Sequence, residues 1–497
     1  MDQYHDKVAG CWIGKCLGGG IGMPYEGVPY RPQLSAKDIV LLDVPNDDLE
    51  LQLIWLVAMD KYGAGLSHEN MGQIWLDHIP HGCDEYSIAQ RNLRYGIMPP
   101  YSGYFDNFFA DGMGAAIRSE VWAALFPSRP ELAVHFAELD ASVDHYGNGV
   151  YGEIYMAAAE SMAFCCNNIY ECLDKARSFI AADCRLSMGL NLVFSLYDAG
   201  ETAETAGKII RDRLNHHNFT DCVMNIAYGV YALLWGKGDL LESIILSVNI
   251  GRDTDCTAAS VGAFLGIIKG RNGLPQDMIN MVKNELTVSD FVSAVPGVPL
   301  TLQDTVDMTC RLRTRLAAEA DKLVPVPYRP LSDLARPEVL PKARFLVLDD
   351  RTDPVEKICE ALRSTGKCPE TWRHKIIEVS DLQFELSNFA ENANTLHLLT
   401  FMECSNPPAE GVVVSAAADV GSTLWFDDER VCNHHSRQLS IPSFHRVEGG
   451  CNFVCKFKDG ERKLVHWKLY SCLPPLKAAL MFGNCFNDHL SCCKLDI

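Results

Sequence analysis

The chain has 497 residues, 48% of them hydrophobic and 22% charged, which is the composition of a globular protein with a large core and more than one domain. Its 64 acidic and 44 basic side chains give a formal charge of −20, which excludes nucleic acid and an anionic membrane surface as bulk partners. Because the N-terminal residues lack the pattern of a signal peptide and no apolar run reaches about 18 residues, we expect a cytoplasmic protein. The 20 scattered cysteines, none in a C-x-x-C pair, are expected to be reduced.

Residues 1 to about 320 have the periodicity of helices. In "ELAVHFAELDASV", "GEIYMAAAESMAFCC" and "CVMNIAYGVYALLWG" apolar residues recur at spacings of three and four, and Gly, Pro and Asn separate such segments. The sequence therefore predicts an all-α domain over residues 1–323. The proline-rich residues 324–343 cannot propagate a helix and are predicted to be a linker.

Residues 344–497 have a different pattern. Short alternating segments such as "HLLTFM", "GVVVSAA", "STLWFDDERV", "CNFVCKF" and "KLVHWKLYS" are separated by turn residues. This pattern predicts a β-sandwich, and the strands loosely resemble the jelly-roll accessory modules of glycoside hydrolases. A purely structural cap is the alternative.

Two aspartates stand one residue apart in "GRDTDCTAAS", where a helix is predicted to begin. Beyond them the small residues Ala259, Gly262, Ala263, Gly266 and Gly270 form one stripe, which favours close packing against a neighbouring helix. Helix capping is one interpretation of Asp253 and Asp255, since a carboxylate is favourable at a helix N-terminus. Two aspartates are more than a cap requires.

A second helix start, in "VPNDDLELQLIWL", has the same arrangement through Asn46, Asp47 and Asp48. If the two starts converge, each pair of like charges at ~4 Å would cost on the order of 4 kcal/mol at an effective dielectric constant near 20. A divalent cation would remove this repulsion. Oxygen ligands favour Mg²⁺ or Mn²⁺ over zinc.

Four stretches resemble, in order, the ADP-ribosylglycohydrolase family, which includes the dinitrogenase reductase-activating glycohydrolases and the ADP-ribosyl-acceptor hydrolases. They are "VAGCWIGKCLGGGIGMPYEG", "NDDLELQLIWL", the segment 111–153 that begins "DGMGAAIRSE", and "GRDTDCTAASVGAFLG". The resemblance covers roughly residues 6–320 and does not include the β-rich third of the chain.

The resemblance implies an all-α catalytic domain with one or two metal ions, usually Mg²⁺, that hydrolyses the bond between the distal ribose of ADP-ribose and an acceptor. It also implies the roles of individual residues. The metal-ligand positions are Asn46, Asp47, Asp48, Asp253, Asp255 and Cys256. The catalytic candidates are Glu26, Asp47, Asp48 and Asp255, with Glu26 first as a base or gate. The substrate-binding candidates are Gly112, Met113, Gly114, His145 and Glu153.

This sequence departs from the family pattern at four positions. Asn46 replaces a threonine, Cys256 replaces a hydroxyl residue, Gly19 replaces an aspartate and Met113 replaces an asparagine. Sulfur is a poor ligand for a hard cation, so one of the two metal sites is expected to be weaker.

We therefore expect an Mg²⁺-dependent hydrolase acting on ADP-ribosylated proteins or small acceptors. A metal-dependent glycoside or nucleoside hydrolase with a different substrate, whose β-domain is a carbohydrate-binding module, is the alternative. A non-catalytic protein that keeps the fold is a third interpretation, disfavoured by the presence of all four motif aspartates and Glu26. The acceptor and the oligomeric state are not specified by these patterns.

Overall fold

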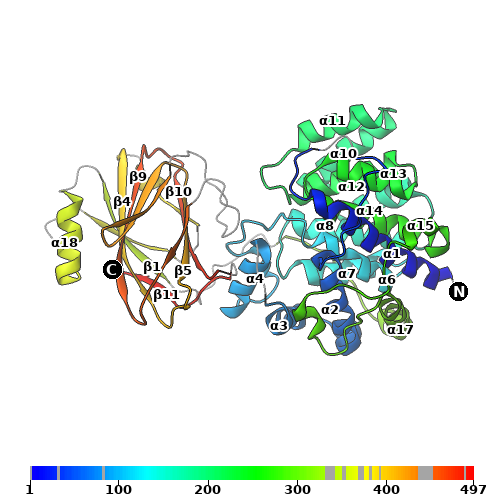
Figure 1. Ribbon diagram of the computed structural model, residues 1–497, viewed down its shortest axis with the longest axis horizontal. Coiled ribbons are helices and arrows are strands. Elements are labelled where there is room, and N and C mark those ends of the chain that lie inside the picture. Colours follow the sequence, from blue (N-terminus) through cyan, green and yellow to red (C-terminus); the bar gives the residue numbers. More distant parts are fainter. Residues whose placement is uncertain are drawn as a thin grey trace. The chain divides into compact units, whose positions relative to one another are not determined.

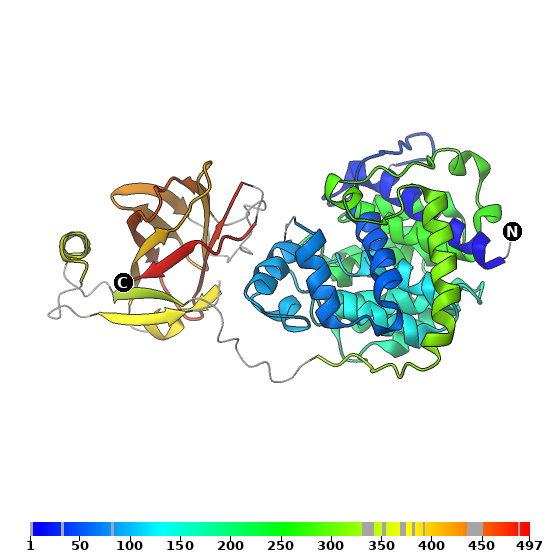
Figure 2. The ribbon, with the colours of Figure 1, turned by 90° about the horizontal axis from the view of Figure 1, so that it is seen from below.

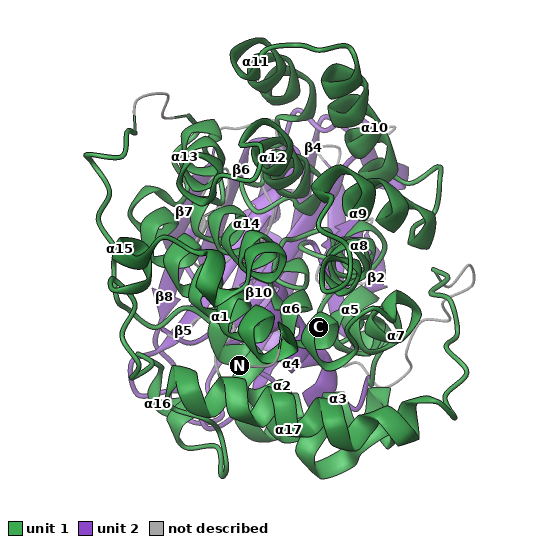
Figure 3. Ribbon diagram, turned by 90° about the vertical axis from the view of Figure 1, so that its right-hand side faces the viewer, with its two compact units in different colours: residues 1–80, 98–104, 109–334 green, residues 81–97, 105–108, 335–497 purple. Residues whose placement is uncertain are grey.

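The computed structural model describes residues 3–30, 34–80, 84–330, 342–349, 354–367, 374–379, 383–390, 393–434, 451–485 and 488–497. The chain divides into two compact units, coloured separately in Figure 3. The first unit comprises residues 1–80, 98–104 and 109–334, and the second comprises residues 81–97, 105–108 and 335–497. The predicted linker 324–343 falls at the division between the units, and its residues 331–341 lie outside the described part.

The first unit is helical, as the periodicity of its sequence predicts. The three helices expected from apolar spacing are present as α7, α8 and α12. The helices before residue 330 are α1 (Gln3–Gly22), α2 (Asp47–Tyr62), α3 (His68–His78), α4 (Asp84–Arg94), α5 (Tyr101–Tyr104), α6 (Ser119–Leu125), α7 (Pro130–Ala141), α8 (Asn148–Ala163), α9 (Ile169–Ala176), α10 (Arg185–Asp198), α11 (Ala203–Leu214), α12 (Cys222–Trp235), α13 (Leu240–Ile250), α14 (Thr254–Lys269), α15 (Gln276–Ile279), α16 (Asp290–Ser293) and α17 (Leu302–Ala320). Of these, α4 belongs to the second unit.

Helix α14 runs through the interior of the first unit, among α1, α8, α12 and α13 (Figure 1). Every residue from Thr254 to Ile267 is buried. A helix with small and apolar residues on all sides has no face suited to water, which explains its central position.

Helix α17 closes another side of this unit by packing along α2. Arg315 of α17 lies 2.6 Å from the Asp60 carboxylate and donates a hydrogen bond to the Met59 carbonyl at 2.6 Å. In Figure 2, α17 is the long yellow-green helix of the first unit, and α2 is one of the blue helices of that unit. This contact fixes the C-terminal end of α2, whose N-terminal end carries functional candidates.

The second unit contains two antiparallel sheets packed as a sandwich, as predicted. One sheet has the strand order β2-β1-β4-β9-β6-β7 with β11 also paired to β4, and the other has the order β3-β10-β5-β8. The five predicted alternating segments correspond to β4 to β9. The strands are β1 (Ala343–Asp349), β2 (Lys375–Val379), β3 (Gln383–Glu385), β4 (Thr395–Cys404), β5 (Val412–Ala418), β6 (Ser422–Phe426), β7 (Glu429–His434), β8 (Cys451–Cys455), β9 (Arg462–Tyr470), β10 (Lys477–Gly483) and β11 (Cys493–Asp496).

The alternation along β1 shows how both faces of the larger sheet are buried. Phe345 and Val347 point into the core between the sheets, whereas Leu346 and Leu348 point to the opposite face. Helix α18 (Val355–Thr365) covers that opposite face (Figure 1). This helix and the short α19 (Ser387–Ala390) are not part of the predicted β pattern.

Two further expectations bear on the whole chain. Among the helices of the described residues, none combines the length and the apolar character needed to cross a bilayer. Most cysteines with described side chains have free thiols, as expected. Cys432 is disulfide-bonded, so the expectation of reduced thiols is wrong at this position.

Candidate metal centre

Helices α1 and α14 approach each other so closely that only glycine fits at several contacts. A Cβ atom on Gly14 would lie 2.0 Å from the Gly262 carbonyl oxygen, and one on Gly10 would lie 2.3 Å from the Gly266 carbonyl oxygen. The small-residue stripe of α14 therefore packs against a second stripe on α1, as predicted. This contact places the C-terminal end of α1, and the turn with Glu26 that follows it, next to the N-terminal end of α14.

The backbone between residues 251 and 253 joins that turn to α14. The Gly27 N–H donates to the Arg252 carbonyl at 2.8 Å, and the Arg252 N–H donates to the Val28 carbonyl at 2.7 Å. Gly251 has a φ of +91°, and a Cβ there would lie 2.6 Å from the Pro29 carbonyl oxygen. Glycine is thus required where the two segments meet.

Asp253 occupies the N-cap position of α14, but its side chain accepts no capping hydrogen bond. The capping interpretation is therefore wrong for Asp253. Its carboxylate is buried, with 2% of its surface exposed, as is that of Asp255, with 4% exposed. Both are held at the positive end of the helix dipole, where anionic groups are favoured.

At the start of α2, by contrast, the cap is formed. The Asn46 side-chain oxygen accepts a hydrogen bond from the Asp48 N–H at 2.7 Å. The Asn46 amide nitrogen faces Asp255 at 3.5 Å, so Asn46 presents a donor to the acidic residues in this arrangement. The cap leaves the Asp48 carboxylate free to project toward α14.

The two helix starts converge, as predicted, and form two groups of possible metal ligands. Asp48, Asp255 and Cys256 place ligand atoms within 4.8 Å of one another, and so do Glu26, Asp253 and Asp255. Asp255 belongs to both groups. Each group could hold a metal ion, and the two groups share one carboxylate.

The buried carboxylates of this cluster are poorly satisfied by the protein. Among the described residues, both side-chain oxygens of Asp48, Oδ2 of Asp253 and Oδ1 of Asp255 have no hydrogen-bond partner. Buried polar atoms are normally paired, and a buried carboxylate without a partner is costly. Oxygen atoms of this kind fit a divalent cation such as Mg²⁺ or Mn²⁺.

The raised pKa values of the buried aspartates also favour a bound cation. Burial raises the pKa of Asp253 well above its usual range, and the Asp255 and Asp48 carboxylates raise it further. Burial also raises the pKa of Asp48, against the opposing effect of Lys15, and the pKa of Asp255. A bound cation would supply the positive charge that lets all three ionise.

A buried lysine lies beneath the acidic cluster, and sequence reasoning missed it. Lys15 donates to the Glu120 carboxylate at 2.8 Å, and Gln52 donates to the same carboxylate at 2.8 Å. Although burial alone would lower it, the Glu120 and Asp48 carboxylates raise the pKa of Lys15 and keep the amine charged. The signal in the sequence was that Lys15 is the one charged residue in the apolar and glycine-rich stretch 8–22.

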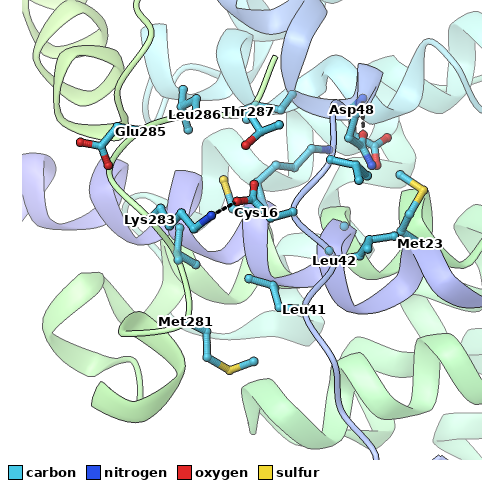
Figure 4. Close-up of a pocket in the computed structure, with 18 residues that line it drawn as sticks. Cys16, Met23, Leu41, Leu42, Asp48, Met281, Lys283, Glu285, Leu286 and Thr287 are labelled. Atoms are coloured by element: carbon cyan, nitrogen blue, oxygen red, sulfur yellow. Dashed lines mark hydrogen bonds and ion pairs between the residues drawn. The ribbon is translucent and has the colours of Figure 1, made fainter. Parts of the chain in front are cut away.

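A cavity of about 470 Å³ opens beside Asp48 (Figure 4). Its wall includes Lys15, Gly19 and Asn46 near the acidic cluster, and Met23 and Leu42 farther along. The segment 281–287, which no sequence motif marked, forms the opposite wall, and the volume is in the range of small-molecule sites.

Gly19 faces this cavity and leaves room in it. A Cβ atom there would lie 3.5 Å from the Asn46 amide nitrogen and 3.9 Å from Asp48 Oδ2, which are ordinary contacts. Packing therefore does not require glycine at this position. Where the resemblance implies an aspartate, this glycine leaves the edge of the acidic cluster without a carboxylate.

Two predicted substrate-binding residues lie in a different polar network. His145 Nδ1 is 2.9 Å from the Asp144 carboxylate, which accepts two hydrogen bonds from Arg118 at 2.9 Å. Glu153 accepts a hydrogen bond from the Trp122 ring N–H at 2.8 Å, and burial raises its pKa well above the usual range. The side chains of His145 and Glu153 are fully buried, so their role in substrate binding stays a prediction.

The predicted glycine loop lies next to α12. Gly112 forms an isolated antiparallel bridge with Asp221, and Gly112, Met113 and Gly114 are all buried. Met113 has 2% of its surface exposed, which fits a packing role at the position where the family has asparagine. Its part in substrate binding is likewise a prediction.

Comparisons with known proteins match the helical part of the chain. The model of a family described as ADP-ribosylglycohydrolase matches residues 1–309, which is more than half of the chain. A protein of Archaeoglobus fulgidus without an assigned function is 25% identical over 300 residues, which cover 56% of this chain and 92% of that protein. ADP-ribosylarginine hydrolase Tri1 of Serratia proteamaculans is 22% identical over 303 residues, covering 58% of this chain and 78% of that protein.

Among solved structures, one chain of an "ADP-ribosylglycohydrolase-related protein complex" is similar to this chain. The match has a TM-score of 0.44 and 16% sequence identity, and it covers 64% of this chain and 100% of that one.

Proposed function

The chain belongs to the ADP-ribosylglycohydrolase family and is a glycosidic-bond hydrolase, and from this premise we propose that its acidic site cleaves ADP-ribose from an acceptor with the help of Mg²⁺. The bond concerned joins C1 of the distal ribose to the acceptor. The observation that carries the proposal is the convergence of Glu26, Asp48, Asp253 and Asp255, several of whose buried oxygens have no partner among the described residues.

The family is metal-dependent in general, and the acidic cluster has the ligands for metal ions. Asp48, Asp255 and Cys256 would hold one cation, and Glu26, Asp253 and Asp255 would hold the other, with Asp47 and Asn46 at the rim of the site. Oxygen ligands dominate both sets, which supports Mg²⁺, with Mn²⁺ as a substitute. When bound, such cations polarise ribose hydroxyls and water.

The residues of the chain then have distinct roles in hydrolysis. A water molecule attacks C1, the bond from C1 to the acceptor breaks, and the acceptor leaves with the bonding electron pair and a proton. Glu26 is exposed beside the buried aspartates and is the first candidate to accept the proton that the attacking water loses. Asp47 is also exposed, whereas buried Asp48 and Asp255 are better suited to holding cations than to exchanging protons with solvent.

A direct test is the release of ADP-ribose from ADP-ribosylated arginine, because one relative is named as an ADP-ribosylarginine hydrolase. We expect Mg²⁺-dependent release that stops when a chelator is added. The variant Glu26→Gln should lower kcat by about 10²–10⁴-fold, the usual size of a general-base effect, while the cation held by Asp48, Asp255 and Cys256 still binds. Glu204→Gln, on the exposed side of α11, is the matched control and should keep the full rate.

An unchanged kcat in Glu26→Gln would remove Glu26 from the proposed base role. Serine-linked ADP-ribose should be assayed in parallel, since the acidic cluster does not itself select the acceptor. Absence of release from both acceptors would shift the proposal to the second candidate.

That second candidate is a metal-dependent hydrolase of another glycoside or nucleoside, with the β-sandwich as a carbohydrate-binding module. The open space at Gly19, where the family has an aspartate, favours it, because this position faces the cavity beside Asp48. This candidate predicts that nucleosides or sugars bind the acidic site and that ADP-ribose does not.

A further inference from the structure

The second unit contains a cluster of three cysteines that is unrelated to the acidic site. Cys404 ends β4 and Cys493 begins β11, and the two residues are directly opposite each other in the antiparallel pair. The Ser405 N–H donates to the Cys492 carbonyl at 3.0 Å, so the neighbouring pair of Cys404 and Cys493 is of the non-hydrogen-bonded kind. Side chains approach most closely in such pairs.

The three sulfur atoms form a triangle. Sγ of Cys404 lies 3.5 Å from Sγ of Cys492 and 3.7 Å from Sγ of Cys493, and the two adjacent cysteines have sulfurs 4.0 Å apart. Thiolates bound at ~2.3 Å around one tetrahedral cation are roughly 3.8 Å apart, so the triangle already has the required size. All three thiols are free.

The surroundings of the triangle are apolar on one side. Cys404 is fully buried and Cys493 has 9% of its surface exposed, both in the core between the sheets, whereas Cys492 is half-buried at its edge. Burial raises the pKa of Cys404 to about 12 and also raises the pKa of Cys493. Without a cation these thiols stay protonated, and a thiophilic cation would displace their protons.

We propose that Cys404, Cys492 and Cys493 form a thiolate site for Zn²⁺, completed by a fourth, exchangeable ligand such as water. Within the described residues, no fourth His, Cys, Asp or Glu side chain joins the three sulfurs in one cluster. The open position lies on the side of Cys492, the cysteine that solvent reaches. Three thiolates and one open position match a zinc site that binds an external ligand, since zinc prefers four-coordination.

The test is titration of the reduced full-length chain with Co²⁺, a spectroscopic substitute for Zn²⁺, followed by displacement with Zn²⁺. Cys256 would add a sulfur signal from the acidic site, so the reference protein carries Cys256→Ser. In this background we expect one equivalent of Co²⁺ to give thiolate charge-transfer absorption and the visible bands of a tetrahedral ion.

Cys492→Ser should weaken this binding by about tenfold or more, because it removes one of the three ligands. Its half-exposed position makes it the substitution least disruptive to the core. Cys485→Ser, an exposed cysteine of the same unit outside the triangle, is the matched control and should leave the titration unchanged.

Absorption that persists in Cys492→Ser would overturn the proposal, as would binding of Cu(I) without any binding of Co²⁺ or Zn²⁺. A Cys404–Cys493 or Cys404–Cys492 disulfide in the untreated protein, mapped by mass spectrometry, would also contradict it and would make the cluster a redox pair. Hydrolytic activity does not enter these measurements, so the outcome is independent of the proposed function.

Discussion

Asp255 contributes a carboxylate oxygen to both ligand groups of the acidic site, and this shared position makes it the most sensitive residue of the site. We predict that Asp255→Asn abolishes binding of both cations, whereas Asp253→Asn affects mainly the group that includes Glu26. Mg²⁺ titration calorimetry on both variants measures this, with Asp277→Asn as a control at an exposed position of α15.

The fold of these variants should survive. In the absence of metal an amide replaces a buried carboxylate that lies close to like charges, so the unfolding temperature should be unchanged or higher. Equal Mg²⁺ affinity in Asp255→Asn and the unmodified protein would rule out the metal assignment at this residue.

Cys256 supplies a sulfur where oxygen would bind a hard cation better. Its Sγ lies within 4.8 Å of carboxylate oxygens of Asp48 and Asp255, and its burial raises the pKa of its thiol well above the usual range. We predict that Cys256→Thr increases occupancy of the cation held by Asp48 and Asp255, because a hydroxyl is the harder ligand. Titration with Mn²⁺ monitored by paramagnetic resonance measures the occupancy, and weaker binding in the variant would refute this view of Cys256.

At the scale of single elements, the contact between α1 and α14 holds the site together. Gly14→Ala places a methyl group 2.0 Å from the Gly262 carbonyl oxygen, which the two backbones cannot absorb without moving apart. We predict a loss of about 1–3 kcal/mol in the free energy of unfolding. Urea denaturation measures this loss.

Gly19→Ala is the matched control on the same helix, since its nearest contact would be 3.5 Å. It should be neutral or slightly stabilising, because alanine has the higher helix propensity. Equal stability of the Gly14 and Gly19 variants would show that the close approach of the two helices is not needed.

In the larger sheet, His466 of β9 packs between His397 and the Trp425 ring. Burial, together with the nearby charge of His397, lowers the pKa of His466 from 6.5 to about 3. The His466 ring therefore stays neutral in the folded chain at pH values where the unfolded chain protonates it. Its contribution to the stability of the fold is fully present above pH 6.5. The contribution is lost as the pH falls from 6.5 toward 3.

We predict that His466→Gln flattens the fall in unfolding free energy below pH 6.5 by up to about 1.4 kcal/mol per pH unit. Urea denaturation at pH 7 and pH 5 compares the two proteins. Identical pH dependence would mean that the His466 ring titrates normally in the folded state.

Local patterns in the sequence were sufficient to predict the elements that carry the acidic site. The small-residue stripe of α14 and the paired acidic helix starts were visible because each depends on residues close in sequence. The partnership of Lys15 with Glu120 and the cavity wall at 281–287 were not predicted, because they join residues more than a hundred positions apart. Helix α18 was missed because its short amphipathic segment lies among strands.

At the scale of the whole molecule, each unit carries its own kind of possible metal ligand. The helical unit holds hard oxygen ligands at the ends of two helices, and the β-sandwich holds three soft sulfur ligands at a strand pair. The acidic site must also accept an anionic product although the chain has a formal charge of −20. In the proposed function, bound cations, the two helix N-termini and Lys15 would supply the positive potential that this requires.

The most direct test of the central claim is calorimetric titration of ADP-ribose into the full-length protein, first with Mg²⁺ and then with a chelator. Because ADP-ribose is the product of the proposed reaction, its binding tests the site without any assumption about the acceptor. The proposed function predicts micromolar binding that requires the metal and is lost in Asp255→Asn. Heat that persists with the chelator, or no heat under either condition, would contradict a metal-dependent ADP-ribose site at these aspartates.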